Sequence, residues 1–181
     1  FVAIMTLLLG RDSNPQMCER RIVNNYFSAL FHDLPESVTR DIISPVKQAT
    51  DDLPNIVKKI EDEKVNKELV PLMEDFFVDE LIYYTSDEFS NRILDEDGKL
   101  KIVTWEELND KYNSDEFQPV DGKLVRICDH FSALMEAEIS IKHGITSSHL
   151  TTGREATLNH YKENEIISVI NVNQFYKKII L

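Results

Sequence analysis

The sequence is poor in the residues that constrain a chain covalently or break its regular structure. It holds 2 cysteines, 5 glycines and 6 prolines among 181 residues, a composition typical of ordinary soluble globular proteins. Cys18 and Cys128 are too few for a disulfide framework and form no C-x-x-C pair. We therefore expect free thiols and a cytoplasmic protein. A chain of this length buries roughly two-thirds of its unfolded surface, so stability alone demands no metal.

Positive charge is also scarce. Lys and Arg total 20 against 32 Asp and Glu, which gives a formal net charge of -12. This charge repels phosphate backbones and anionic lipid headgroups, so we expect neither a nucleic-acid polymer nor a membrane as partner. A small anionic substrate remains compatible with the charge only if a metal or a few basic side chains reverse the potential inside one pocket.

Long apolar runs are missing as well. The longest, Phe1 to Leu9, is about half of the ~20 residues that span a bilayer. It lacks the charged start and cleavage site of a signal peptide, which predicts a core helix. The run opens without an initiator Met and without a capping residue. We therefore expect that an N-terminal segment precedes it.

Apolar residues recur at steps of three and four in three long stretches, which predicts helices over about 18–31, 55–84 and 123–141. Pro35 disfavours helical geometry just before it, so the first of these helices should end at His32 and Asp33. The region of about 85–122 is more polar, and its Asp-Glu-Asp-Gly turn predicts a β-hairpin within 92–103. The expected fold is all-α, a single-domain helical bundle over 1–181 with a small β-hairpin-like insertion.

One group of residues has the chemistry of a metal site. His32 and Asp33 are followed by Glu36 and Asp41, and Asp129 lies far downstream in a helical segment. Imidazole nitrogen and carboxylate oxygen are ligands that divalent cations prefer, so His32, Asp33 and Asp129 would bind one if the fold brought them together. The residues alone favour plainer roles, namely a helix-terminal histidine bonded to a carbonyl, a capping aspartate and a solvated aspartate.

A family resemblance changes that balance. The run from Ala29 to Lys47, ALFHDLPESVTRDIISPVK, closely resembles the second-helix motif of HD-domain phosphohydrolases, in particular the branch of bacterial 5′-deoxynucleotidases. The segment from Leu124 to Glu138, LVRICDHFSALMEAE, is similar to the helix that carries the last metal-binding aspartate of that family. The resemblance covers about 1–84 and 123–161 and implies an HD-domain helical bundle.

The resemblance also implies roles for individual residues. His32, Asp33 and Asp129 would be three ligands of one divalent metal ion, Co, Mn, Mg, Zn or Fe, with the fourth ligand expected upstream of Phe1. Glu36 and Asp41 would be catalytic carboxylates: Glu36 at the reacting phosphate and Asp41 at the sugar hydroxyl, where Asp41 also binds substrate. Lys47 would place a cation near the substrate, and a solvated helix lysine explains it about equally well.

The predicted function is therefore that of a divalent-metal-dependent phosphomonoesterase acting on a small nucleotide, a (deoxy)ribonucleoside 5′-monophosphate. The resemblance makes a homodimer possible, because relatives are commonly dimers. Two alternatives stay open. One is a non-catalytic HD-fold protein that binds a nucleotide or a partner, and the other is a nucleotide phosphodiesterase or pyrophosphohydrolase using the same metal centre.

Overall fold

A computed structural model describes residues 1–39, 53–163, 165–168 and 170–180. It is mostly helical with two small antiparallel strand pairs, which confirms the predicted fold class. The chain divides into two compact units, the first made of Phe1–Ala29 with Asp87–Leu181 and the second of Leu30–Ser86. The prediction of a single domain over the whole chain stays a prediction.

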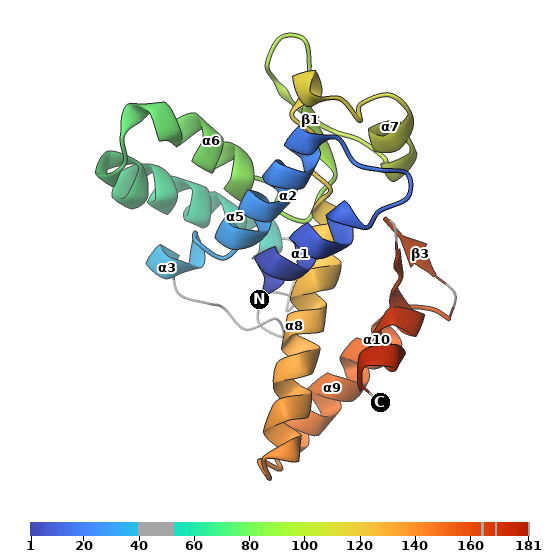
Figure 1. Ribbon diagram of the computed structural model, residues 1–181. Coiled ribbons are helices and arrows are strands. Elements are labelled where there is room, and N and C mark those ends of the chain that lie inside the picture. The colour runs from blue at the N-terminus through green and yellow to red at the C-terminus, as the bar shows by residue number, and fades with distance from the viewer. Residues whose placement is uncertain (40–52, 164, 169, 181) are drawn as a thin grey trace. The chain divides into compact units, whose positions relative to one another are not determined.

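The first unit is built around one long helix, α8 (Gly122–Lys142), which Figure 1 shows in yellow and orange. Helices α1 (Val2–Arg11), α9 (Ser148–His160) and α10 (Val172–Ile180) pack against it. Apolar residues of α8 form the core with partners from these helices, and the ring of Phe131 stacks on that of Tyr176, 5.5 Å between centroids. The helix predicted over 123–141 is thus confirmed as the centre of this unit.

Local sequence explains where α8 begins and ends. The side chain of Asp121 accepts a hydrogen bond from the amide of Leu124 (3.0 Å) and so caps the first turn. Gly122 lies against the backbone of another segment, since a Cβ at this position would come within 2.4 Å of the carbonyl oxygen of Ser90. The helix ends before Gly144, whose φ of +85° suits a residue without a side chain.

The segment between α6 (Asp75–Thr85) and α8 contains the predicted hairpin. Strands β1 (Arg92–Leu94) and β2 (Leu100–Ile102) pair antiparallel, with Ile93 opposite Lys101. The carboxylate of Asp95 accepts hydrogen bonds from the amides of Asp97 and Lys99, which closes the turn. The short helices α7 (Trp105–Asp110) and η3 (Asp115–Phe117) follow.

The C-terminal tail contains a short strand pair followed by a helix. Strands β3 (Ile166–Ile167) and β4 (Ile170–Asn171) pair antiparallel and lead directly into α10. The side-chain oxygen of Asn171 accepts a hydrogen bond from the amide of Gln174 (3.1 Å), as a helix-capping residue does. Val172 and Tyr176, one turn apart, are the residues that α10 buries.

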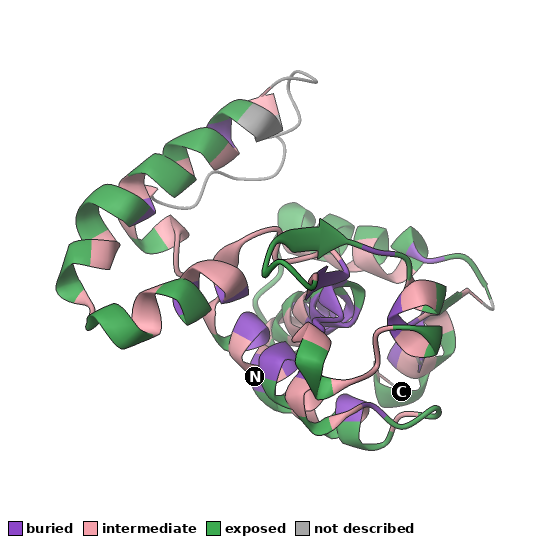
Figure 2. Ribbon diagram, turned by 90° about the horizontal axis from the view of Figure 1, so that it is seen from above, coloured by how far each residue is buried: buried purple, intermediate pink, exposed green. Residues whose placement is uncertain are grey.

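The second unit holds the end of α2 (Glu19–Phe31), then α3 (Glu36–Thr39), α5 (Leu53–Lys64) and α6 (Asp75–Thr85). A π-helical turn, η1 (Val65–Leu69), and a 3-10 turn, η2 (Val70–Leu72), join α5 to α6. The ring of Phe31 packs edge-on against Phe77 at 6.1 Å and stacks on Tyr84 at 6.4 Å. Most of the other residues of these helices are exposed or half-buried (Figure 2).

Helix α2 is present as predicted, but its buried face differs from the expected apolar stripe. The residues it buries are mainly polar: Arg21, Asn24, Asn25, Ser28 and Ala29. Val23 and Leu30 of the predicted stripe are exposed. The reversal has a physical reason, because the buried polar side chains pair with groups from distant segments instead of facing water.

Within the described residues, no helix combines the length and the apolar character that crossing a bilayer requires. The predicted helix over Phe1–Leu9 exists as α1. It buries Ala3, Thr6 and Gly10, whereas Phe1, Ile4 and Leu8 remain exposed. The run is therefore a core helix on one face only.

Candidate functional site

His32 and Asp33 lie at the end of α2, where the sequence places them. The helix ends at Phe31, and a turn over 32–35 leads into α3. In this turn the amide of Leu34 donates to the carbonyl of Phe31, and the amide of Glu36 donates to that of Asp33. The change of direction that Pro35 predicts is thus confirmed.

The side chains of the pair face each other. Nε2 of His32 lies 3.1 Å from Oδ2 of Asp33. The imidazole is 8% exposed, whereas the carboxylate is 67% exposed. A protected nitrogen beside a solvent-facing carboxylate places two donor atoms of the types that divalent cations prefer at one helix terminus.

Glu36 is the first residue of α3 and is half-buried. It follows the His32–Asp33 pair after one short turn and belongs to the same unit. The predicted substrate-binding residues, Asp41 and Lys47, lie outside the described residues.

Asp129 lies in the middle of α8 and is half-buried. Val125, one turn before it, is fully buried against Ala3 of α1 and Ala29 of α2. Asp129 belongs to the first compact unit and the His32–Asp33 pair to the second. The three-ligand set therefore stays a prediction.

The donor chemistry of His32 and Asp33 fits a divalent metal, and their spacing fits two neighbouring ligands. Among residues 1–39, 53–163, 165–168 and 170–180, no three His, Cys, Asp or Glu side chains are grouped so as to hold a metal ion. The described structure thus brings together two of the three candidate ligand residues, His32 and Asp33.

The residue after Asp129 takes part in a chain of polar rings. Nδ1 of His130 lies 2.7 Å from the hydroxyl of Tyr161, and the hydroxyl of Tyr176 donates to the carbonyl of Ile127 at 2.8 Å. Burial lowers the pKa of His130 and raises that of Tyr161. Both rings therefore favour their neutral forms beside α8.

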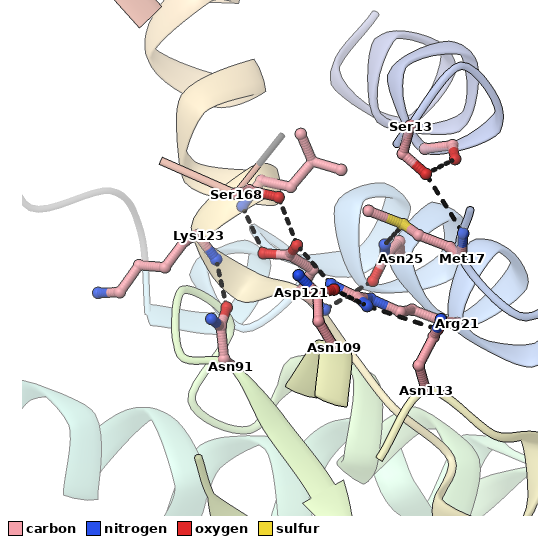
Figure 3. Close-up of polar contacts among 12 residues, drawn as sticks. Ser13, Met17, Arg21, Asn25, Asn91, Asn109, Asn113, Asp121, Lys123 and Ser168 are labelled. Atoms are coloured by element: carbon pink, nitrogen blue, oxygen red, sulfur yellow. Dashed lines mark hydrogen bonds and ion pairs between the residues drawn. The ribbon is translucent and has the colours of Figure 1, made fainter. Parts of the chain in front are cut away.

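Sequence reasoning missed a buried ion pair in the first unit. The guanidinium of Arg21, on α2, donates to the carboxylate of Asp121 at 3.1 Å, and both side chains are 0% exposed. Arg21 also donates to the side-chain oxygen of Asn109 (2.7 Å), and the hydroxyl of Ser168 donates to Asp121. The amide of Asp121 donates to Asn25 (2.7 Å). Figure 3 shows these side chains converging on Asp121.

A second buried arginine lies close by in the same unit. Arg92 donates to the hydroxyl of Ser28 (3.0 Å) and to the carbonyls of Asp87 and Ser90 (3.2 Å each). The signal available in the sequence is the run of polar residues at helical spacing on α2: Arg21, Asn24, Asn25 and Ser28. Together these contacts fix α2 against the start of α8.

Comparison with known proteins gives one match. The model of a family described as HD domain matches residues 1–158. Searches of curated proteins and of solved structures gave no match. The matched range contains His32, Asp33, Glu36 and Asp129.

Proposed function

The chain belongs to the HD-domain family, and on this premise we propose that it removes phosphate from deoxyribonucleoside 5′-monophosphates, as a divalent-metal-dependent phosphohydrolase. HD domains are in general metal-dependent hydrolases. The observation that carries the proposal is the His32–Asp33 pair, with its two donor atoms 3.1 Å apart at the end of α2. The resemblance of the run 29–47 to 5′-deoxynucleotidases supports the narrower substrate class.

In this proposal His32, Asp33 and Asp129 hold the metal. A bound divalent cation lowers the pKa of its water ligand and offsets the negative charge of the phosphoryl oxygens. His32 suits this role because its ring is shielded from solvent and its Nε2 faces the carboxylate of Asp33, so that both atoms could bind the same ion. A local cation would also offset the repulsion between a nucleotide and a chain of net charge -12.

Glu36 is proposed to manage the proton at the reacting phosphate. It opens α3 directly after the metal pair and is half-buried. A carboxyl group that is partly shielded from water suits proton transfer to a leaving oxygen. Asp41 is proposed to contact the sugar hydroxyl and Lys47 the phosphate, on the basis of the sequence motif alone.

The direct test is phosphate release from a substrate panel, with metal content measured on the same samples. The panel contains deoxyribonucleoside and ribonucleoside 5′-monophosphates, a phosphodiester and a dinucleoside pyrophosphate. The proposal predicts release from the deoxyribonucleoside monophosphates. Cleavage of the phosphodiester or the pyrophosphate alone would instead identify one of the alternative hydrolases, and binding without any cleavage a non-catalytic protein.

An Asp33→Asn variant tests the metal assignment. We expect it to lose bound metal and activity together, by more than the about 10–100-fold that loss of an outer-shell partner costs. Asp79→Asn is the matched control, because Asp79 is an exposed aspartate on α6 of the same unit. Full activity and metal content in the Asp33 variant would refute the assignment.

A further inference from the structure

We propose that a cavity beside α8 binds a small phosphorylated ligand that carries a planar ring. The cavity has a volume of about 330 Å³. Its lining comes from α8, the end of α9 and β3, all within the first unit, and consists of Lys123, Arg126, Ile127, His160, Tyr161 and Ile167. The inference does not depend on the proposed function.

Two cations mark the rim of this cavity. Lys123 and Arg126 are one turn apart at the start of α8, and both are exposed. The guanidinium of Arg126 lies over the ring of Phe89, 5.2 Å from its centroid, which restrains it without using its hydrogen-bond donors on another side chain. Figure 3 shows the side chain of Lys123 extending away from the buried network around Asp121.

A rim with two cations departs from the overall charge of the chain, which has 20 basic and 32 acidic residues. Glu165 belongs to the loop that leads into β3, and its carboxylate accepts a hydrogen bond from the amide of Lys162 (2.8 Å). That bond holds the carboxylate in its own turn, and its negative charge acts on Tyr161 of the cavity lining. An arginine and a lysine at one rim suit the several oxygens of a phosphate group, since charge-assisted hydrogen bonds to phosphate are the strong ones.

The remaining walls are apolar and aromatic. Ile127 is 1% exposed and Tyr161 is 7% exposed. The ring of Tyr161 is fixed by the bond of its hydroxyl to His130 and by edge contact with the ring of His160, 4.8 Å between centroids. A fixed tyrosine ring beside an isoleucine side chain suits a flat ring of a ligand, because such a ring can stack and bury its apolar surface there.

The size and position of the cavity define the class of ligand. Its volume falls near the lower end of the about 300–1,000 Å³ that small-molecule sites occupy, which fits a molecule of mononucleotide size. Asp129 is not among the described residues that line the cavity, although it lies one turn after Arg126 on the same helix.

The experiment measures binding to metal-free protein in a chelator, so that no turnover intervenes. Three probes are compared: 2′-deoxyadenosine 5′-monophosphate, 2′-deoxyadenosine and inorganic phosphate. Binding is followed through the amide NMR signals of Lys123 to Ile127 and of Ile167. We expect the monophosphate to shift these signals saturably and to bind more tightly than either fragment. Equal affinity for inorganic phosphate or for the unphosphorylated nucleoside would overturn the proposal.

A double variant, Lys123→Gln with Arg126→Gln, should lower the affinity for the monophosphate by about tenfold or more. Arg11→Gln with Lys142→Gln is the matched control, since it removes the same charge from exposed positions of α1 and α8 outside the cavity. Lys123→Glu, a single change at an exposed residue, gives a second reading should the double variant fold poorly. Identical affinities in the rim and control variants would refute the site.

The Asp33→Asn variant separates this inference from the proposed function. The monophosphate should shift the cavity signals in that variant as it does in the wild type, whatever becomes of phosphate release. Loss of the cavity shifts in Asp33→Asn would overturn the assignment of these signals to a separate site.

Discussion

Arg21 shows how a single residue can decide the packing of a helix. A buried guanidinium is costly unless it is paired and hydrogen-bonded. Here Asp121 supplies the opposite charge and Asn109 a further acceptor. Because Asp121 also caps α8, the same carboxylate links the buried face of α2 to the start of the central helix.

Removing one member of the Arg21–Asp121 pair should lower the stability of the protein strongly. Arg21→Met leaves the carboxylate of Asp121 buried without its charge partner, and we expect a loss of about 3–5 kcal/mol in the free energy of unfolding, measured by urea denaturation. Lys64→Met, which breaks the exposed Lys64–Glu68 pair on the second unit, should change stability little. A comparable effect of the two substitutions would contradict the role given to Arg21.

The two cysteines should differ sharply in reactivity. Burial raises the pKa of the Cys128 thiol to about 12, and burial also raises the pKa of Cys18, which is only half-buried. The thiolate is the reactive form, so at pH 8 both are slow and Cys128 is the slower. Labelling with a chromogenic disulfide should modify Cys18 first in native protein, and Cys128 only with unfolding. Equal native rates would disprove this ordering.

At the scale of the element, α2 marks the limit of pattern reasoning. Its helical period and its end before Pro35 are readable from the sequence, because both depend on local backbone preferences. Its buried face is not readable, because burial of Arg21 depends on Asp121, a hundred residues away. Periodicity identifies a helix but misplaces its core face when polar groups find partners in distant segments.

Two further elements can be read from the local sequence, the β1–β2 hairpin and helix α10. The hairpin of β1 and β2 is predictable because Asp95 and Gly98 close its turn with local contacts. Helix α10 is readable in the same way, because its apolar residues recur at steps of three and four: Val172, Phe175, Tyr176, Ile179 and Ile180. The side chain of Asn171 caps its start.

Two glycines in helices should respond oppositely to alanine. At Gly122 a Cβ would meet the backbone of Ser90 at 2.4 Å, so Gly122→Ala should cost about 1–3 kcal/mol in unfolding free energy. At Gly153 in α9 nothing lies within 4 Å of the added atom, so Gly153→Ala should gain about 0.5–1 kcal/mol through helix propensity. Thermal or urea unfolding measures both, and a stable Gly122 variant would contradict the close approach.

At the scale of the molecule, the two compact units differ in their cores. All three clusters of buried apolar residues found in the described structure belong to the first unit. The second unit buries fewer apolar side chains among its described residues: Val57, Val65, Leu81 and Tyr84. The residues that the sequence predicts for the metal site belong to both units. Sequence motifs do not indicate how the chain divides into compact units.

This difference predicts unequal local stability. Amide hydrogen exchange under native conditions should be at least about tenfold slower in α8 than in α5, because exchange follows local opening and α5 has few buried contacts to lose. Mass spectrometry of peptides from the two helices measures the ratio. Protection in α5 equal to that in α8 would show that the second unit opens only with the first.

The candidate site was predictable only in part. His32, Asp33 and Asp129 are recognisable from their surrounding motifs, and the structure places His32 and Asp33 with their donor atoms together. The cavity at Lys123 and Arg126 carries no motif, because its lining comes from three elements that meet only after folding. Local sequence patterns reveal residues that belong to a family motif and miss a cavity whose lining only tertiary packing assembles.

The seclusion of Arg21 and Asp121 has a consequence for the solvent conditions that the protein tolerates. Dissolved ions screen charges through the surrounding water, with a Debye length of about 8 Å at physiological ionic strength. Neither side chain of this pair is exposed to water, so added electrolyte weakens its attraction far less than it weakens an attraction at the surface. The attraction between Arg21 and Asp121 should therefore differ little between dilute buffer and concentrated salt.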